Sequence, residues 1–264
     1  TRYPKAGDTN PSVKVGFVEV GNVRSRDIPV VVWADFDEKE DQYFGIPYWS
    51  GDSRLFILPW MPREQNQMCI YQVNPKDGSR SPIYDETQPT WIDWVTEGHF
   101  TGEGMYMVRD FSLWEQIYYL PYDGSAPVKQ LTCGENWNIR ILKVDEKAGL
   151  LFYSANCDSR VRRDVYKVDM KRGTTEKISF GEYSFETVLI SPDNKKYVAL
   201  HSNAQTPTIL SLVTPGKKMK VVELDNAKDE RYENGELPIP KMVSITTPDG
   251  YELPGVITLP LDMD

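Results

Sequence analysis

Residues 69–78 read CIYQVNPKDG, a strand of alternating apolar residues that runs into a turn closed by glycine. This arrangement returns three more times, as QIYYLPYDG at 116–124, DVYKVDMKRG at 164–173 and TILSLVTPG at 208–216. Glycine suits the closing position because a tight hairpin needs a positive φ there. The four closing glycines follow one another at intervals of 46, 49 and 43 residues. This spacing is typical of a four-stranded propeller blade, which takes about 40–50 residues.

Each of these units also contains three further predicted strands. A lead strand is expected at 44–49, 91–95, 139–144 and 185–191; a second strand at 54–59, 105–109, 150–154 and 196–201; and an outer strand at 80–84, 128–131, 175–178 and 220–224. The pattern predicts an all-β fold, a partial β-propeller of four-stranded antiparallel blades. A generic β-sandwich is the alternative, and the repeated strand and glycine turn favour the propeller.

The segments outside the four units have different patterns. The predicted parts are outer strands of a preceding blade with a connector at 1–42, about four blades at 43–228, a linker at 229–240, and the first hairpin of a truncated α/β-hydrolase domain at 241–264. The outer strands are expected at 13–20 and 28–34, and the hairpin turns at a Pro-Asp-Gly sequence. We therefore expect the chain to start and stop inside a longer protein.

Charge and hydropathy exclude several classes of partner. The 264 residues carry a formal net charge of −9, whereas nucleic acid and anionic membranes both require a basic face. The longest apolar run, at 28–34, is far too short to cross a bilayer. The local basic run Arg160, Arg162 and Arg163 is interpreted as a solvated hairpin loop rather than an anion site. The sequence predicts no nucleic-acid partner and no membrane span in this chain.

Cysteine and histidine are too few and too scattered for a metal site. The three cysteines, Cys69, Cys133 and Cys157, have no CxxC spacing, and we expect mostly buried thiols, with one disulfide if the protein is exported. Their pairing and the redox compartment stay open at this point. The two histidines, His99 and His201, are expected to be structural. No metal and no cofactor are predicted.

Three stretches carry a resemblance to a known family. RYPKAG at 2–7, followed by Asn10-Pro11, is the most specific; Thr132 to Trp137 is similar to a Thr-x-Gly-x-Trp string of the family; and 241–260 looks like the first hairpin of its hydrolase domain. On these residues the chain resembles the dipeptidyl peptidase IV branch of the prolyl oligopeptidase family of serine peptidases. The resemblance implies about half of an eight-bladed propeller that sits over an α/β-hydrolase domain.

The resemblance also implies an activity and a location. The full-length protein would be a serine exopeptidase that releases N-terminal dipeptides with proline or alanine in second place, and the propeller would gate access of the peptide substrate. A periplasmic or extracellular location is implied as well. Open blade edges predict a homodimer or other self-association. The alternative is a stand-alone, non-enzymatic propeller that binds a peptide or a sugar, which the hairpin at 241–260 disfavours.

The chain itself is predicted to lack catalytic residues. An α/β-hydrolase presents its nucleophile on a Gly-x-Ser-x-Gly elbow. No serine in the chain has both glycines, and Ser53, the nearest match, lacks the second. The resemblance places the catalytic triad beyond Asp264, and it places the glutamates that grip the substrate amino group before the YPKAG string. We therefore expect this chain alone to be inactive.

One segment is a candidate for the substrate pocket. In the family the corresponding propeller segment helps to line the extended pocket, and the matching residues here are WIDWVTEGHF at 91–100. The segment is shorter than in the family, and the family's Phe-Arg pair is not matched. Asp93 and Trp94 are the candidates to approach the pocket. The alternative is that Trp91 and Trp94 pack between blades.

Overall fold

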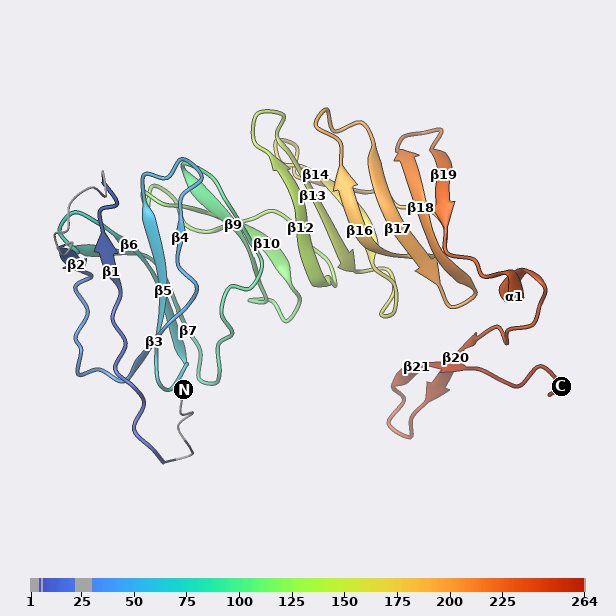
Figure 1. Ribbon diagram of the computed structural model, residues 1–264, viewed down its shortest axis with the longest axis horizontal. Helices are drawn as coiled ribbons and strands as arrows, with labels where there is room; N and C mark the ends of the chain where they lie inside the picture. Colours follow the sequence, from blue (N-terminus) through green and yellow to red (C-terminus); the bar gives the residue numbers. More distant parts are fainter. Residues whose placement is uncertain (1–4, 6, 22–29, 264) are drawn as a thin grey trace. The chain divides into compact units, whose positions relative to one another are not determined.

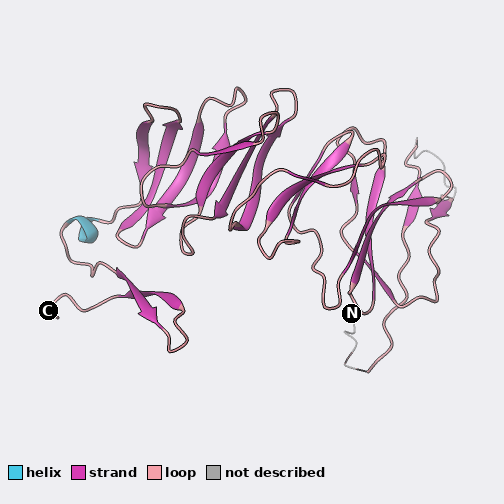
Figure 2. Ribbon diagram, turned by 180° about the vertical axis from the view of Figure 1, so that it is seen from behind, coloured by secondary structure: helices cyan, strands magenta, loops and turns pink. Residues whose placement is uncertain are grey.

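A computed structural model gives the structure of the chain and describes residues 5, 7–21 and 30–263 (Figure 1). Within these residues the secondary structure is almost entirely β-strand, and the one-turn α1 (Glu230–Glu233) is the only helix (Figure 2). The chain divides into two compact units, residues 1–108 with 118–129 and residues 109–117 with 130–264. The predicted all-β class is confirmed.

The first unit contains a two-stranded and a five-stranded sheet. β1 (Gly16–Val18) pairs antiparallel with β2 (Val31–Trp33), so both strands are shorter than predicted; residues 28 and 29 lie outside the described residues. The larger sheet has the order β3-β5-β6-β7, with β4 also paired to β5. Its strands are β3 (Gln42–Phe44), β4 (Tyr48–Trp49), β5 (Phe56–Pro62), β6 (Gln67–Val73) and β7 (Arg80–Thr87).

The prediction of a single lead strand at 44–49 is wrong, because Gly45, Ile46 and Pro47 separate β3 from β4. Proline has no N–H to give to a sheet ladder. The break also brings Gly45 against the indole of Trp94, since a methyl group on Gly45 would lie 2.9 Å from Trp94 Cε3. Both pieces still pair with β5. A broken strand therefore fills the lead position of this blade.

The next sheet has the order β11-β10-β9-β8, with β8 (Gly98–Phe100), β9 (Gly104–Arg109), β10 (Gln116–Pro121) and β11 (Lys129–Gln130). The predicted lead strand at 91–95 is wrong, because no strand forms there and β8 begins only at Gly98. The Ile92 N–H donates to the Gln65 carbonyl at 2.8 Å, and the Ile92 side chain is buried. The segment is thus held against the β5–β6 turn, and its backbone hydrogen bond goes there instead of to β9.

The second unit contains two four-stranded meanders whose strands follow the order of the sequence. The first is β12 (Trp137–Asp145), β13 (Leu150–Asn156), β14 (Asp164–Asp169) and β15 (Thr174–Lys177); the second is β16 (Ser184–Ile190), β17 (Tyr197–Asn203), β18 (Thr206–Thr214) and β19 (Lys220–Asn226). All of these strands overlap the predicted ranges. Phe152 and Val165 of the first meander share a buried core with Phe185 and Tyr197 of the second.

The glycine turns that mark the repeat adopt the predicted backbone conformation. Their φ angles are positive in all four units, at 79°, 66°, 68° and 142° for Gly78, Gly124, Gly173 and Gly216. Gly78 is also closely packed, since a methyl group there would lie 2.0 Å from the Trp33 carbonyl oxygen. Successive antiparallel meanders with this turn are the blades of a propeller. The predicted partial β-propeller is confirmed.

The chain after the last meander forms α1 and a hairpin. The carboxylate of Asp229 caps α1 by accepting a hydrogen bond from the Arg231 N–H at 2.9 Å, so the predicted linker is not wholly irregular. β20 (Lys241–Thr246) pairs with β21 (Glu252–Ile257), and Gly250 in the connecting turn has a φ of 84°. A hairpin thus forms in the predicted segment, and its assignment to a hydrolase domain stays a prediction. Among the described residues, none of the helices has the length and apolar character needed to cross a membrane.

Candidate functional site

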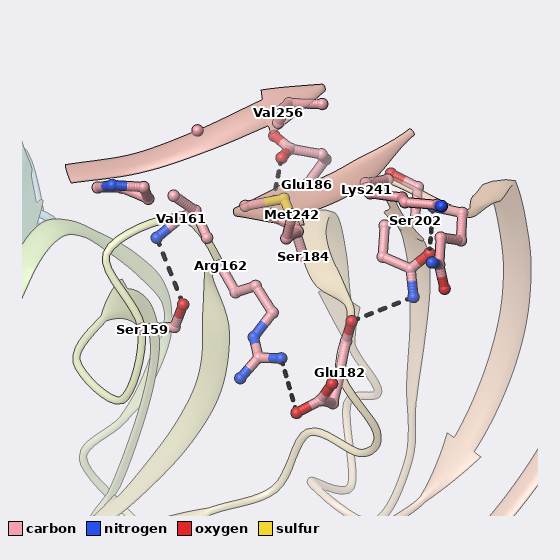
Figure 3. Close-up of a pocket in the computed structure, with 15 residues that line it drawn as sticks. Ser159, Val161, Arg162, Glu182, Ser184, Glu186, Ser202, Lys241, Met242 and Val256 are labelled. Carbon is pink, nitrogen blue, oxygen red and sulfur yellow. Dashed lines mark hydrogen bonds and ion pairs between the residues drawn. The ribbon is translucent and has the colours of Figure 1, made fainter. Parts of the chain in front are cut away.

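A cavity of about 840 Å³ lies in the second unit, where one end of the two meanders faces the C-terminal hairpin (Figure 3). Four segments form its walls: the loop after β13, the start of β16, the β17–β18 turn and the β20–β21 hairpin. The charged, polar and apolar side chains of the lining include Arg162, Glu182, Glu186, Asn203, Lys241 and Met242.

A buried amide shapes the loop that carries Arg162. Asn156, the last residue of β13, is buried, and its side-chain amide donates to the carbonyl of Arg162 at 2.9 Å and to that of Arg160 at 3.4 Å. Because a buried amide must be satisfied, the backbone of loop 157–163 curls around it. Arg162 extends from this loop toward Glu182 (Figure 3).

Arg162 and Glu182 form the charged wall of the cavity. Arg162 Nη1 lies 3.1 Å from Glu182 Oε1, and Asn203 Nδ2 donates to the Glu182 carbonyl at 3.2 Å. Nearby, Ser184 Oγ donates to Glu186 Oε1 at 3.2 Å. With Lys241 and Met242 opposite on the hairpin, the lining offers charges of both signs and some apolar surface. Such a mixed lining suits an extended peptide, which presents both donors and acceptors.

The cavity contains serines but no set of groups for acyl transfer. Its described lining residues include neither histidine nor cysteine, so Ser159, Ser184 and Ser202 have no imidazole base within the lining. A serine–histidine contact does exist in the core, where His201 Nε2 lies 3.0 Å from Ser211 Oγ. Both residues are buried, and His201 lies against the rings of Phe180 and Tyr183, so this contact supports packing, in agreement with the predicted structural role of His201.

A metal site has no support in the part of the chain that the structure describes. No three side chains of histidine, cysteine, aspartate or glutamate come together there in a way that could hold a metal ion.

The arginine run is more than a solvated loop, which corrects the interpretation from sequence. Arg160 Nη1 donates to the Glu252 carbonyl at 3.2 Å, and the Arg160 guanidinium lies 4.5 Å from the centre of the Tyr251 ring. A guanidinium stacked in this way is attracted to the aromatic face. Arg160 therefore holds the hairpin turn, and Arg162 pairs with Glu182. The charge run was a visible signal, but its partners are distant in sequence.

The two candidates from sequence, Asp93 and Trp94, lie in the first unit just before β8. Trp94 packs on an apolar cluster that includes Met61 and Met105, and its indole covers Gly45. Asp93 is exposed and accepts a hydrogen bond from Trp91 Nε1 at 3.1 Å. Neither residue lines the 840 Å³ cavity. Their approach to a substrate stays a prediction.

The three thiols are free and differ in exposure. Cys69 is buried, Cys157 is half-buried and Cys133 is exposed. The expectation of mostly buried thiols therefore holds for Cys69 and is wrong for Cys133, which lies in the irregular segment before β12. Burial also raises the pKa of the Cys69 thiol to about 11.

Comparison with known proteins decides the family. A sequence profile described as dipeptidyl peptidase IV (DPP IV) N-terminal region matches residues 1–208. The chain belongs to this family. Dipeptidyl peptidase 4 of Trichophyton tonsurans is 26% identical over 263 residues, and dipeptidyl peptidase 4 of Arthroderma otae is 27% identical over 273. The matches cover 96% and 98% of this DPP IV-family chain, which spans about a third (33% and 34%) of the length of these curated relatives.

Solved structures agree with the DPP IV assignment. The crystal structure of Porphyromonas gingivalis dipeptidyl peptidase 4 matches with a TM-score of 0.79 and 26% identity, over 100% of this chain and 37% of that chain. A putative dipeptidyl aminopeptidase IV from Bacteroides ovatus gives a TM-score of 0.75 at 19% identity, over 100% of this chain and 40% of that one. The second likeness supports the fold alone. The DPP IV N-terminal region and its blade architecture are thus established for this chain.

Proposed function

We propose that this chain is the substrate-gating propeller part of a serine-type dipeptidyl peptidase, and that the full-length protein releases N-terminal X-Pro and X-Ala dipeptides. The family match over residues 1–208 carries the proposal. The cavity of about 840 Å³ supports it, because its mixed polar and apolar lining suits a peptide. The absence of an imidazole from the described lining also supports it, because gating needs no base.

In this proposal the bond-breaking chemistry belongs to an α/β-hydrolase domain, and residues 241–264 form its start. The hairpin leaves Ile245, Leu253, Val256 and Ile257 exposed. Apolar side chains gathered on one small hairpin are surface that further packing covers. The propeller part then restricts which peptides reach the hydrolase, and it contributes hydrogen bonds and charge along the way.

The direct test compares the 264-residue chain with the full-length protein on a Gly-Pro-linked chromogenic substrate. The chain alone should release no chromophore, whereas the full-length protein should cleave the substrate and react with a serine-directed phosphonate. The matched control is the N-acetylated substrate, which an exopeptidase that requires a free amino group leaves intact. Turnover by the purified chain alone would refute the assignment of bond cleavage to the hydrolase domain. A full-length protein that cleaves neither substrate would refute the activity.

A stand-alone binding propeller for a peptide or a sugar is the second candidate. Lys241 and Met242 of the hairpin line the cavity, so the hairpin is part of the site and not a dispensable tail. This observation favours the peptidase. Calorimetric binding of a sugar by a full-length protein that has no peptidase activity would reverse the order of the two candidates.

The proposal extends to location and self-association. A periplasmic or extracellular location is part of the proposal, as the resemblance of the sequence implies, and cell fractionation with antibody detection of the full-length protein tests it. Self-association is supported by β19, an edge strand that exposes Val221, Val222 and Leu224. An exposed apolar edge is a template for pairing with another chain. Light scattering that shows a monomer at every concentration would contradict this part.

A further inference from the structure

We infer that Cys133 and Cys157 form a reversible disulfide that ties the segment before β12 to the loop after β13. The inference goes beyond the proposed peptidase function. Its first support is the strand register, because Trp137 at the start of β12 is paired with Asn156 at the end of β13. Cys157 directly follows Asn156, and Cys133 precedes Trp137 by four residues, at the same end of the two strands.

The segment before β12 folds toward the second cysteine. A methyl group on Gly134, the neighbour of Cys133, would lie 3.8 Å from Cys157 Sγ. Asn136 Nδ2 donates to the Cys133 carbonyl at 2.9 Å and so closes a turn over residues 133–136. Since consecutive Cα atoms are about 3.8 Å apart, Cys133 is one residue from van der Waals contact with the Cys157 sulfur. A disulfide between Cys133 and Cys157 requires their Cα atoms to lie about 4.4–6.8 Å apart.

Buried amides hold this turn in place. Gln116 Nε2 donates to the Gly134 carbonyl at 2.6 Å, and Thr132 Oγ1 donates to Gln116 Oε1 at 2.8 Å. Gln116 and Thr132 are both buried. Because the turn is fixed at its base, the backbone that carries the exposed Cys133 is held beside Gly134, the residue that approaches Cys157. This raises the effective concentration of one thiol near the other.

A buried phenol reports the same proximity. Burial raises the pKa of Tyr153, and the charges of Cys157 and Cys133 raise it further. Tyr153 lies on β13 and is buried. The shift agrees with a position of both thiols in the neighbourhood of Tyr153.

The reaction balances with a low-molecular-weight disulfide, such as oxidised glutathione, as the oxidant. Cys133 is exposed and meets the oxidant first, whereas burial beside Asp158 raises the pKa of the Cys157 thiol. The Cys133 thiolate attacks one glutathione sulfur, forms a mixed disulfide and releases one glutathione thiolate. The Cys157 thiolate then attacks the Cys133 sulfur and releases the second. Two protein thiols lose two electrons and two protons, and the glutathione disulfide is reduced to two thiols.

The bond would act on the cavity wall, because Cys157 directly precedes the loop that carries Arg160 and Arg162. Fixing the base of this loop restrains the ion pair with Glu182 and the contact with the hairpin turn. We expect the oxidised chain to melt at a temperature higher by on the order of 5 °C than the reduced chain. Hydrogen exchange of the amides at 157–163 should slow at the same time.

The test uses the full chain, purified in the reduced state, equilibrated with oxidised glutathione and alkylated after unfolding. The three alkylatable thiols should fall to one, and proteolysis without reduction should yield a cross-linked peptide that contains Cys133 and Cys157. Cys69 is the internal reference, because it is buried and its Sγ donates to Asp85 Oδ2 at 3.3 Å. It should be the thiol that remains.

Three variants complete the test. Cys69→Ser should keep both the cross-link and the rise in melting temperature, whereas Cys133→Ser and Cys157→Ser should lose both. Three alkylatable thiols in the oxidised wild-type chain would overturn the inference. Glutathione left on Cys133, or a Cys133 bond between two chains, would overturn it as well. These outcomes are measured on the wild-type chain, so they test the inference even if a variant fails to fold.

Discussion

Arg162 Nη1 lies 3.1 Å from Glu182 Oε1, so an ion pair joins the loop after β13 to the segment before β16 at the wall of the cavity (Figure 3). The Glu182 side chain is 84% exposed. Water therefore screens the pair, and its contribution to stability is below about 1 kcal/mol. The pair sets where charge sits on the cavity wall more than how stably the blades fold.

Arg162→Ala is expected to leave the free energy of unfolding within about 1 kcal/mol of wild type. In the full-length protein it should raise KM for peptides longer than the dipeptide substrate by a few-fold, with little change in kcat, because one guiding charge is lost. Arg172→Ala is the matched control, since Arg172 forms an exposed ion pair with Asp169. An unchanged KM in Arg162→Ala would show that peptide substrates do not contact this cavity wall.

Arg160→Ala should loosen the C-terminal hairpin. It removes the hydrogen bond to the Glu252 carbonyl and the stacking on Tyr251, so the amides at 241–257 should exchange several-fold faster in hydrogen-exchange mass spectrometry. Arg160→Lys keeps the charge but not the planar stack, and it should give an intermediate rate. Equal exchange rates at 241–257 in Arg160→Ala and in Arg172→Ala would contradict the role of Arg160 in holding the hairpin.

The stability of the chain should fall in acid through His201. Burial lowers the pKa of His201 below its ordinary value of 6.5, and Glu223 opposes the shift. A histidine with a depressed folded pKa binds more protons in the unfolded chain. Stability is therefore present above pH 6.5 and is lost as pH falls from there toward the folded pKa.

Urea midpoints measured between about pH 7.5 and pH 5 test this dependence. His201→Gln should flatten the profile, whereas His99→Gln, in the half-buried β8 strand, should keep it. If the urea midpoint of His201→Gln falls in acid as much as that of the wild-type chain, groups other than His201 cause the effect.

Lys177→Met should destabilise the second unit. Lys177 Nζ lies 2.9 Å from Asp164 Oδ2, and Asp164 is 1% exposed. Removing the lysine leaves this buried carboxylate with Ser179 as its hydrogen-bond donor, at a cost on the order of 3 kcal/mol. Lys167→Met is the control, because its carboxylate partner Glu176 is 57% exposed, and loss of that pair should cost less than about 1 kcal/mol. Similar denaturation midpoints for the two variants would exclude a special role for Asp164.

Gly78→Ala and Gly173→Ala separate backbone strain from steric overlap. The two glycines have similar φ angles, 79° and 68°. A methyl group at Gly173 meets nothing within 4 Å, whereas one at Gly78 would lie 2.0 Å from the Trp33 carbonyl oxygen. Gly173→Ala should cost on the order of 1 kcal/mol, and Gly78→Ala several times as much in thermal or urea unfolding. Equal losses would mean that the backbone near Trp33 gives way.

Local chemistry explains which parts of the fold were predictable. The closing glycines require a positive φ whatever packs around them, so Gly124 and Gly173 marked the period of the blades. The two lead strands that were mispredicted depend on distant partners. Residues 91–95 have the pattern of a strand, yet the Ile92 N–H donates its hydrogen bond to the Gln65 carbonyl. The strand predicted at 44–49 is broken at Gly45, which packs against the indole of Trp94.

The candidate site was much less predictable. The basic run containing Arg162 was visible, but Glu182 and Lys241 carried no signal, and Asp93 and Trp94 lie outside the cavity. The amino-acid sequence by itself determined the blade repeat, its glycine turns and the C-terminal hairpin, because each follows from the conformations of neighbouring residues. Only the tertiary structure decided the cavity, the arginine contacts and the approach of Gly134 to Cys157. Those contacts join residues far apart along the chain, and folding alone brings them together.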